Sequence, residues 1–112
     1  MESTRQQRIA RLIQKEIADI FLRESRQLFG HSMITVTKTY VTRDLAIARV
    51  YLSIYGNQDP SAIIAMVRNH TREIRTLLAN RVRLQIRVIP ALEFYQDDSL
   101  DYIENIERLL KE

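Results

Sequence analysis

The sequence contains no cysteine and no tryptophan, and its 112 residues include only two glycines, two prolines and two histidines. Without cysteine the chain can form neither a disulfide nor a thiolate metal site, as is usual for a small domain in a reducing compartment. With Gly30 and Gly56 as its only glycines, it cannot supply a glycine-rich loop that cradles phosphates. These absences exclude a disulfide-stapled scaffold and a P-loop nucleotide site.

The residues that could support catalysis or metal binding are few. His31 and His70 are far apart in the sequence and lack the spacing of a metal-ligand pair, and no serine or threonine lies in a nucleophile motif. Asp97 and Asp98 could act as an acid and base pair, but carboxylates at the start of a helix are what the cap and the helix dipole favour. We therefore expect no enzyme activity, no cofactor and no metal.

Long apolar runs are also missing. The longest, residues 62–67, is too short to cross a bilayer, and residues 1–11 are polar and charged where a signal peptide would be apolar. With 46% apolar residues, the chain is long enough for one domain, residues 1–112, around one modest core. We expect a cytoplasmic monomer with no membrane role.

Arginine is the residue that the sequence has in excess. It accounts for 14 of the 17 basic residues, and the net charge is +3 with a pI of about 9.5. The planar guanidinium group binds phosphate through paired hydrogen bonds, so an arginine-rich, mildly basic domain favours a nucleic-acid partner. An ordinary solvated surface remains an equally good explanation of the charge alone.

A strictly alternating stretch near the middle of the chain predicts a strand that organises the fold. One face carries Ala46, Ala48, Val50, Leu52 and Ile54, with polar and aromatic residues on the other. Residues 33–41 form a second, threonine-rich strand, in which Ile34, Val36 and Tyr40 match that apolar face across a turn at residues 42–44. Together they predict a β-hairpin.

Helical spacing of apolar residues predicts three helices around this hairpin. The first runs from a cap at Ser3 or Thr4 to about residue 28, and the second occupies residues 60–80 after Asp59 as its cap. Residues 84–95 alternate as a third strand, with Pro90 suggesting an edge or a bulge, and Asp98 or Ser99 caps a last helix.

The order helix, strand, strand, helix, strand, helix predicts an α+β fold of two layers. A crossover helix between two strands favours a parallel, right-handed connection, so we expect a mixed three-stranded sheet with helices on one face.

Three stretches resemble one known family, the ribosome-binding factor A family of bacterial small-subunit assembly factors. They are residues 43–51 (RDLAIARVY), 74–78 (IRTLL) and 90–100 (PALEFYQDDSL), with further support from residues 14–18 (QKEIA). The resemblance implies a type II KH-like fold. It also implies a non-catalytic protein that binds the small ribosomal subunit and its ribosomal RNA during late maturation, including in the cold. At the place where that family has an Ala-x-Gly kink, this chain has residues 70–72 (HTR).

We predict that basic side chains bind ribosomal RNA phosphates, with the shape of the RNA giving the specificity. The predicted contacts come from the first helix, the hairpin turn and the second helix with the residue after it: Arg8, Lys15, Arg43, Arg68, Arg72, Arg75 and Arg83. Of these, Arg68, Arg72 and Arg75 should form one solvent-facing row on the second helix.

Other interpretations remain open. The acidic Glu16 and Asp19 could pair with the basic stripe of the first helix, leaving an ordinary helix face. Tyrosines and arginines on the outer sheet face could stack RNA bases, but cross-strand pairing among themselves is the favoured interpretation. The chain could also be a generic KH-like RNA-binding domain, or a module that docks on ribosomal proteins or other assembly factors.

Overall fold

Three helices and three strands make up the part of the chain that the computed structural model describes, residues 2–28, 33–56 and 59–97. In chain order they are α1 (Thr4–Leu28), β1 (Met33–Val41), β2 (Ile47–Tyr55), α2 (Pro60–Asn69), α3 (Thr71–Val82) and β3 (Ala91–Gln96). The helix predicted to begin at Asp98 or Ser99 lies outside the described residues. No helix in the described ranges is long and apolar enough to cross a membrane.

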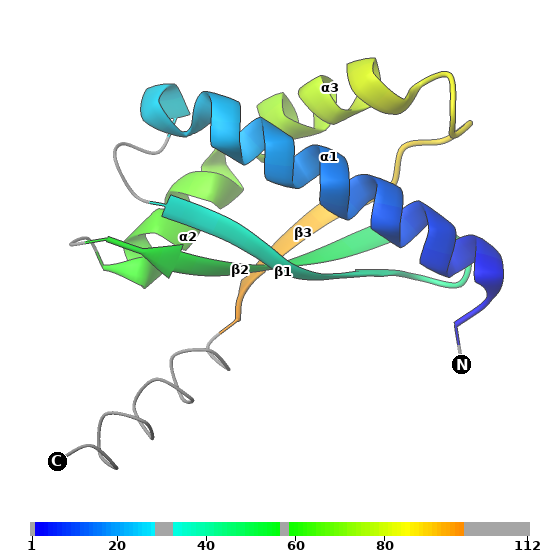
Figure 1. The fold of residues 1–112 in the computed structure, drawn as a ribbon, viewed down its shortest axis with the longest axis horizontal. Coiled ribbons are helices and arrows are strands. Elements are labelled where there is room, and N and C mark those ends of the chain that lie inside the picture. The colour runs from blue at the N-terminus through cyan, green and yellow to red at the C-terminus, as the bar shows by residue number, and fades with distance from the viewer. Residues whose placement is uncertain (1, 29–32, 57–58, 98–112) are drawn as a thin grey trace, which may run out of the picture.

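The strands form one mixed sheet in the order β1-β2-β3. β1 and β2 pair antiparallel as a hairpin, while β3 pairs parallel to β2, with Val50 opposite Phe94. Helices α1 and α3 lie on the same side of this sheet (Figure 1). The α+β class, the mixed sheet and the single helical layer predicted from the sequence are confirmed.

The core lies between the sheet and the helices. On β2, Ala48, Val50 and Leu52 are fully buried, as their alternation predicted, and Phe21 of α1 meets Phe94 of β3 edge to face at 6.1 Å between ring centres. Every helix also contributes fully buried side chains: Ile13, Ile17, Ile20, Ile63, Val67, Ile74, Leu78 and Val82.

The start of α1 is fixed by a capping box. The Ser3 hydroxyl accepts the Gln6 backbone N–H at 3.1 Å, and the Gln6 side-chain oxygen accepts the Ser3 N–H at 2.8 Å. Gln6 is almost fully buried, and its side-chain amide nitrogen also donates to the Val41 carbonyl at 3.0 Å. This glutamine therefore ties the first turn of α1 to the end of β1.

The prediction that Tyr40 lies on the apolar face of β1 was wrong. Val36 pairs with Leu52 and Lys38 with Tyr51, so Thr37 is an extra residue in the strand, a β-bulge. The inserted residue reverses the faces that follow it: Val41 is buried, and Tyr40 lies on the outer face opposite Arg49.

The single helix predicted for residues 60–80 is two helices that meet at His70. The backbone of His70 lies at φ −101° and ψ 14°, outside the helical region, and the Thr71 hydroxyl donates to the Arg68 carbonyl at 2.8 Å. Because α2 packs against β2 and β3 while α3 packs against α1 and β3, one straight helix could not follow both surfaces. A break forms here even though neither Ala nor Gly occupies residues 70–72.

The third strand is shorter than predicted. Residues 83–90 form a connection in which Leu84 is 94% exposed and Val88 is 70% exposed. Its pairing with β2 begins at Ile47 opposite Ala91, next to a hydrogen bond from the Ala91 N–H to the Ala46 carbonyl. Because β3 runs parallel to β2, residues before Pro90 would lie beyond the first residue of β2, where β2 offers nothing to pair with.

Candidate nucleic-acid interface

Three of the predicted RNA contacts lie on elements that meet at one end of the molecule. Arg8 is on the N-terminal part of α1, Arg43 is in the β1–β2 turn, and Arg83 caps the C-terminus of α3. The start of α1, the β1–β2 turn and the end of α3 lie toward the right-hand side of Figure 1. All three side chains are exposed, and none forms a hydrogen bond or ion pair that the structure records with another described residue.

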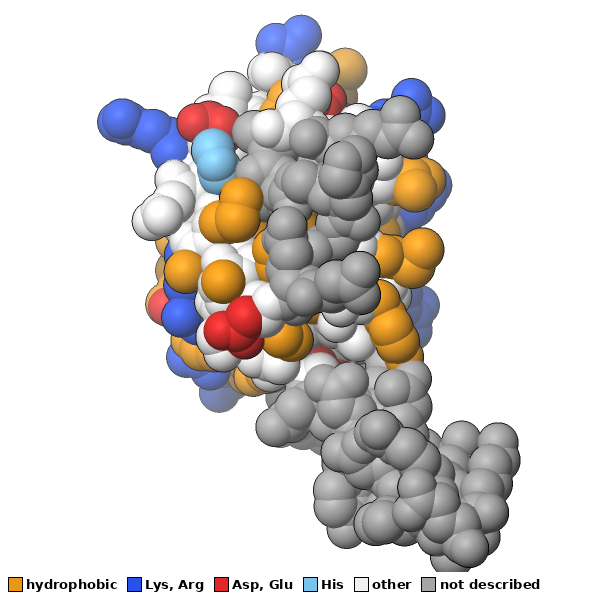
Figure 2. Space-filling view, turned by 90° about the vertical axis from the view of Figure 1, so that its left-hand side faces the viewer, with side chains coloured by type: hydrophobic (Ala, Val, Ile, Leu, Met, Phe, Trp, Pro, Cys, Tyr) orange, Lys and Arg blue, Asp and Glu red, His pale blue; other side chains and the backbone are white. Residues whose placement is uncertain are grey.

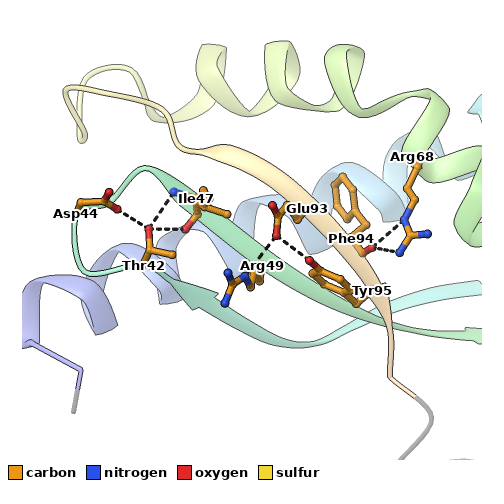
Figure 3. A network of polar contacts seen from close by, with 8 residues as sticks. All are labelled: Thr42, Asp44, Ile47, Arg49, Arg68, Glu93, Phe94 and Tyr95. Carbon is orange, nitrogen blue, oxygen red and sulfur yellow. Dashed lines mark hydrogen bonds and ion pairs between the residues drawn. The ribbon is translucent and has the colours of Figure 1, made fainter.

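The turn that carries Arg43 is held by its neighbours' side chains (Figure 3). The Thr42 hydroxyl donates to Asp44 Oδ1 at 2.7 Å and accepts the Ile47 N–H at 3.1 Å. Asp44 Oδ1 also accepts the Ala46 N–H at 3.1 Å, and the Thr42 hydrogen bond together with this one lowers the pKa of the Asp44 carboxyl. Leu45 takes a left-handed backbone, with φ at 62°. The turn is therefore a defined platform, with Arg43 projecting from it.

Arg68 and Arg75 have a different environment from the other predicted contacts. Arg68 donates from Nε and Nη2 to the Phe94 carbonyl at 3.0 and 2.8 Å (Figure 3). Arg75 donates from Nη2 to the Ile89 carbonyl at 2.7 Å and from Nε to the Pro90 carbonyl at 3.2 Å. Both guanidinium groups therefore brace β3 and the residues before it.

The predicted row of Arg68, Arg72 and Arg75 is interrupted. Arg68 belongs to α2 and the other two to α3, so the break at His70 separates them. Of the three, only Arg72 forms no recorded side-chain hydrogen bond or ion pair within the described residues. Lys15 is exposed on α1 and likewise forms no recorded side-chain hydrogen bond or ion pair within the described residues.

The acidic residues of α1 do not pair with the basic stripe of that helix. Asp19 accepts from Arg81 of α3 at 2.6 Å and from Arg23 one turn along at 2.9 Å, and Glu16 lies 3.3 Å from Arg81. Hydrogen bonding to Arg81 and then to Arg23 lowers the pKa of the Asp19 carboxyl. No sequence pattern indicated Arg81, because its partners are more than sixty residues away.

The outer face of the sheet is filled by side chains that contact one another. Tyr51 and Tyr95 stack at 5.4 Å, and Lys38 lies 5.3 Å from the centre of the Tyr51 ring. Glu93 accepts from the Tyr95 hydroxyl at 2.7 Å and pairs with Arg49 at 3.3 Å (Figure 3). The hydrogen bond to Glu93 raises the pKa of Tyr95. This arrangement is the cross-strand pairing that the sequence favoured over base stacking.

Asp97 forms hydrogen bonds to β1 and β2 that are separate from helix capping. Its carboxylate accepts from the Thr37 hydroxyl at 2.5 Å, and its N–H donates to the Leu52 carbonyl at 2.7 Å. The bulge residue of β1 is thereby linked to the end of β3. The predicted capping by Asp98 lies outside the described residues.

The opposite end of the molecule has a different character. Met33, Tyr55 and Met66 are exposed there. Figure 2, which views the left-hand side of Figure 1, shows hydrophobic side chains near the centre, with Lys and Arg mostly toward the margins. The basic end and this apolar end are therefore distinct surfaces.

The fold and its exposed basic side chains define a class of protein, a KH-like α+β domain without a glycine-rich phosphate loop. The family model described as ribosome-binding factor A matches residues 5–110 of this chain. The chain belongs to the ribosome-binding factor A family. It is 49% identical over 110 residues to ribosome-binding factor A of Cytophaga hutchinsonii, covering 98% of this chain and 83% of that protein. The Flavobacterium psychrophilum protein of the same name is 43% identical over 111 residues, with 98% and 85% covered.

Solved structures show the same fold at lower identity. The crystal structure of ribosome-binding factor A from Thermus thermophilus superimposes with a TM-score of 0.65 at 22% identity, over 81% of this chain and 94% of that one. The solution structure of a Thermotoga maritima protein described as a putative ribosome binding factor A gives 0.67 at 23% identity, over 88% and 92%. A Thermus thermophilus homology model fitted into a cryo-EM map of a 30S–RbfA complex gives 0.65 at 23%, over 81% and 93%.

Proposed function

We propose that this protein is a non-catalytic assembly factor that binds the small ribosomal subunit through its ribosomal RNA. It would act in the cytoplasm during late maturation, including in the cold, without a cofactor. Family membership supports this proposal, as does the Thermus thermophilus relative whose coordinates were fitted into a 30S complex. The observation that carries it is a set of exposed cations whose side chains form no recorded ion pair or hydrogen bond with another described residue.

Five of the predicted contacts meet this description, and we call them the open cations: Arg8, Lys15, Arg43, Arg72 and Arg83. An exposed guanidinium or ammonium group that no carboxylate neutralises is available to replace the counterions of an RNA backbone. Their elements present them on more than one side of a rigid fold, which suits recognition by shape.

Arg68 and Arg75 remain in the proposed interface in a secondary role. A guanidinium group has five N–H donors, and each of these arginines already directs two of its nitrogens at backbone carbonyls. Each keeps a donor for a phosphate, but its position is set by β3. We therefore assign the larger share of the affinity to the open cations.

A salt titration against naked small-subunit ribosomal RNA tests the proposal. Each phosphate contact contributes a slope of roughly 0.7 to 0.9 in log affinity against log salt, so Arg8→Gln should flatten the slope by about that amount. Arg23→Gln is the matched control, since Arg23 is exposed on the same helix but is already paired with Asp19 at 2.9 Å. It should leave the slope nearly unchanged. Affinity for small subunits that hardly varies with salt would contradict the proposal and favour docking on a ribosomal protein.

A further inference from the structure

A groove of about 830 Å³ lies at the basic end of the molecule. Its walls are the first turns of α1, residues 44–46 of the hairpin turn, and residues 85–88 of the connection before β3. The charged groups on it are three arginines, Arg5, Arg8 and Arg87, and one carboxylate, Asp44. The groove is therefore positively charged overall.

One face of α1 supplies both the charge and the apolar floor. Arg5, Arg8, Ile9 and Leu12 follow the spacing i, i+3, i+4 and i+7, so their side chains share one stripe of the helix. The arginines are exposed, while Ile9 and Leu12 are half-buried against the core. Leu45 and Ile86, also half-buried, extend the aliphatic floor from the other two walls.

The walls are held in place before any ligand arrives. Residues 85 and 86 donate their N–H groups to the Val82 carbonyl at 2.8 and 3.0 Å, and Arg75 holds the Ile89 carbonyl at 2.7 Å. The buried hydrogen bond from Gln6 to Val41 fixes α1 against the hairpin. A site fixed in this way loses little conformational entropy on binding.

The polar groups of the groove suit the edge of a nucleobase. Asp44 uses Oδ1 for Thr42 and Ala46, which leaves Oδ2 without a recorded bond to another described residue. That oxygen can accept from an exocyclic amine. The Gln85 amide, on the facing wall, offers both a donor and an acceptor.

We propose that this groove binds an unpaired nucleotide of single-stranded RNA. Its phosphate would meet Arg5, Arg8 or Arg87, and its base would lie on the aliphatic floor with an amine directed at Asp44. The inference rests on the proposed function and refines it, because it assigns one place where RNA is read as a single strand. A nucleobase can offer an amine to Asp44, whereas acidic side chains offer only acceptors, so a nucleotide suits the groove better than an acidic peptide.

Val88 and Leu84 provide a matched pair of variants for the test. Both are exposed aliphatic residues of the same connection, but only Val88 lines the groove. Fluorescence anisotropy with short single-stranded oligocytidylate would measure Val88→Asp and Leu84→Asp against the unchanged protein. We expect Val88→Asp to weaken binding about tenfold and Leu84→Asp to weaken it less than twofold, with unchanged melting temperatures for both.

A second arm tests the base contact. Asp44→Asn keeps an oxygen for Thr42 and Ala46 but places an amide donor where Oδ2 was. The unchanged protein should prefer oligocytidylate to oligouridylate, because cytosine carries an amine where uracil carries a carbonyl oxygen. Asp44→Asn should remove that preference. A preference that survives the substitution would show that Asp44 does not contact the base.

The outcomes separate this inference from the proposed function. Equal losses for the two aspartate variants, or a duplex that binds as tightly as the single strand and loses as much with Val88→Asp, would overturn the nucleotide site. Salt-dependent binding to ribosomal RNA would still support the proposed function in that case. If Val88→Asp leaves RNA affinity unchanged but weakens association with small subunits, the occupant is a protein and the inference is wrong.

Discussion

Two groups of exposed basic residues on this molecule have different surroundings. Arg68 and Arg75 reach across to β3 and hold the carbonyls of residues 89, 90 and 94, while the open cations, such as Arg43 and Arg72, have no recorded side-chain partner within the described ranges. The difference lies in the neighbouring backbone, since both groups consist of exposed basic residues.

The comparison teaches that an exposed arginine on a helix is a poor guide to a ligand site until its acceptors are known. A guanidinium group that satisfies backbone carbonyls contributes to folding, since the Phe94 carbonyl lies on the outer of the described strands and those of residues 89 and 90 lie just before it. One without such acceptors contributes little to folding and remains available to a phosphate.

The largest expected effect is on RNA binding by the open cations. Replacing Arg8, Arg43 and Arg72 with glutamate should lower affinity for small-subunit ribosomal RNA on the order of a hundredfold or more at moderate salt, because contacts are lost and repulsion is added. The melting temperature should stay the same. Filter binding and thermal unfolding of the same preparation measure both quantities. If the triple variant is unfolded or destabilised, the open cations contribute to folding and the distinction between the two groups is wrong.

A smaller effect is expected on folding when the bracing arginines are shortened. Arg68→Met with Arg75→Met keeps much of the apolar stem but removes four donor contacts, and should lower the free energy of unfolding by about 2 kcal/mol in total. Arg72→Met, the control on α3, should change it by less than about 0.5 kcal/mol. Urea titration gives both values. Equal stability of the double variant and the control would remove the distinction between the two groups.

The smallest expected effect concerns the ion pairs between α1 and α3. The Asp19 carboxyl has a pKa below its ordinary 3.8, so its pairs with Arg81 and Arg23 stabilise the fold above that pH, and this contribution is lost as the pH falls through the lowered value. Melting temperatures of the unchanged protein and Asp19→Asn should therefore differ slightly near pH 6 and converge as the pH falls through the lowered pKa of Asp19. A difference in melting temperature that stays constant over this pH range would mean that the charge of the Asp19 carboxylate does not contribute to stability.

Local patterns were sufficient to predict much of the fold. The cap at Ser3, the alternation around Val50 and the Asp59 cap all depend on neighbours within a few residues, and the structure has each of them. The Thr37 bulge was not predicted because threonine occurs on both faces of this strand, so the alternation of residues does not reveal one extra residue. Whether the second helix bends at residues 70–72 was left open, because α2 and α3 follow different packing surfaces, which spacing along one helix does not reveal.

The surroundings of the candidate site were less predictable than its residues. The arginines could be named from composition and spacing, but the acceptors of Arg68 and Arg75 are backbone carbonyls 26 and 14 to 15 residues away. Backbone atoms carry no sequence signal of their own. The groove was likewise invisible, because it joins α1 to a connection that had been predicted as a strand.

The position of the bracing arginines also bears on how copies of this protein behave toward one another. β3 is an outer strand of the sheet, and an exposed outer strand is a template on which a second chain can add its own strand. Arg68 covers the Phe94 carbonyl, and Arg75 covers those just before the strand, so an incoming backbone finds these acceptors already occupied. The same hydrogen bonds that hold β3 in place thus leave fewer acceptors for the strand of a second chain.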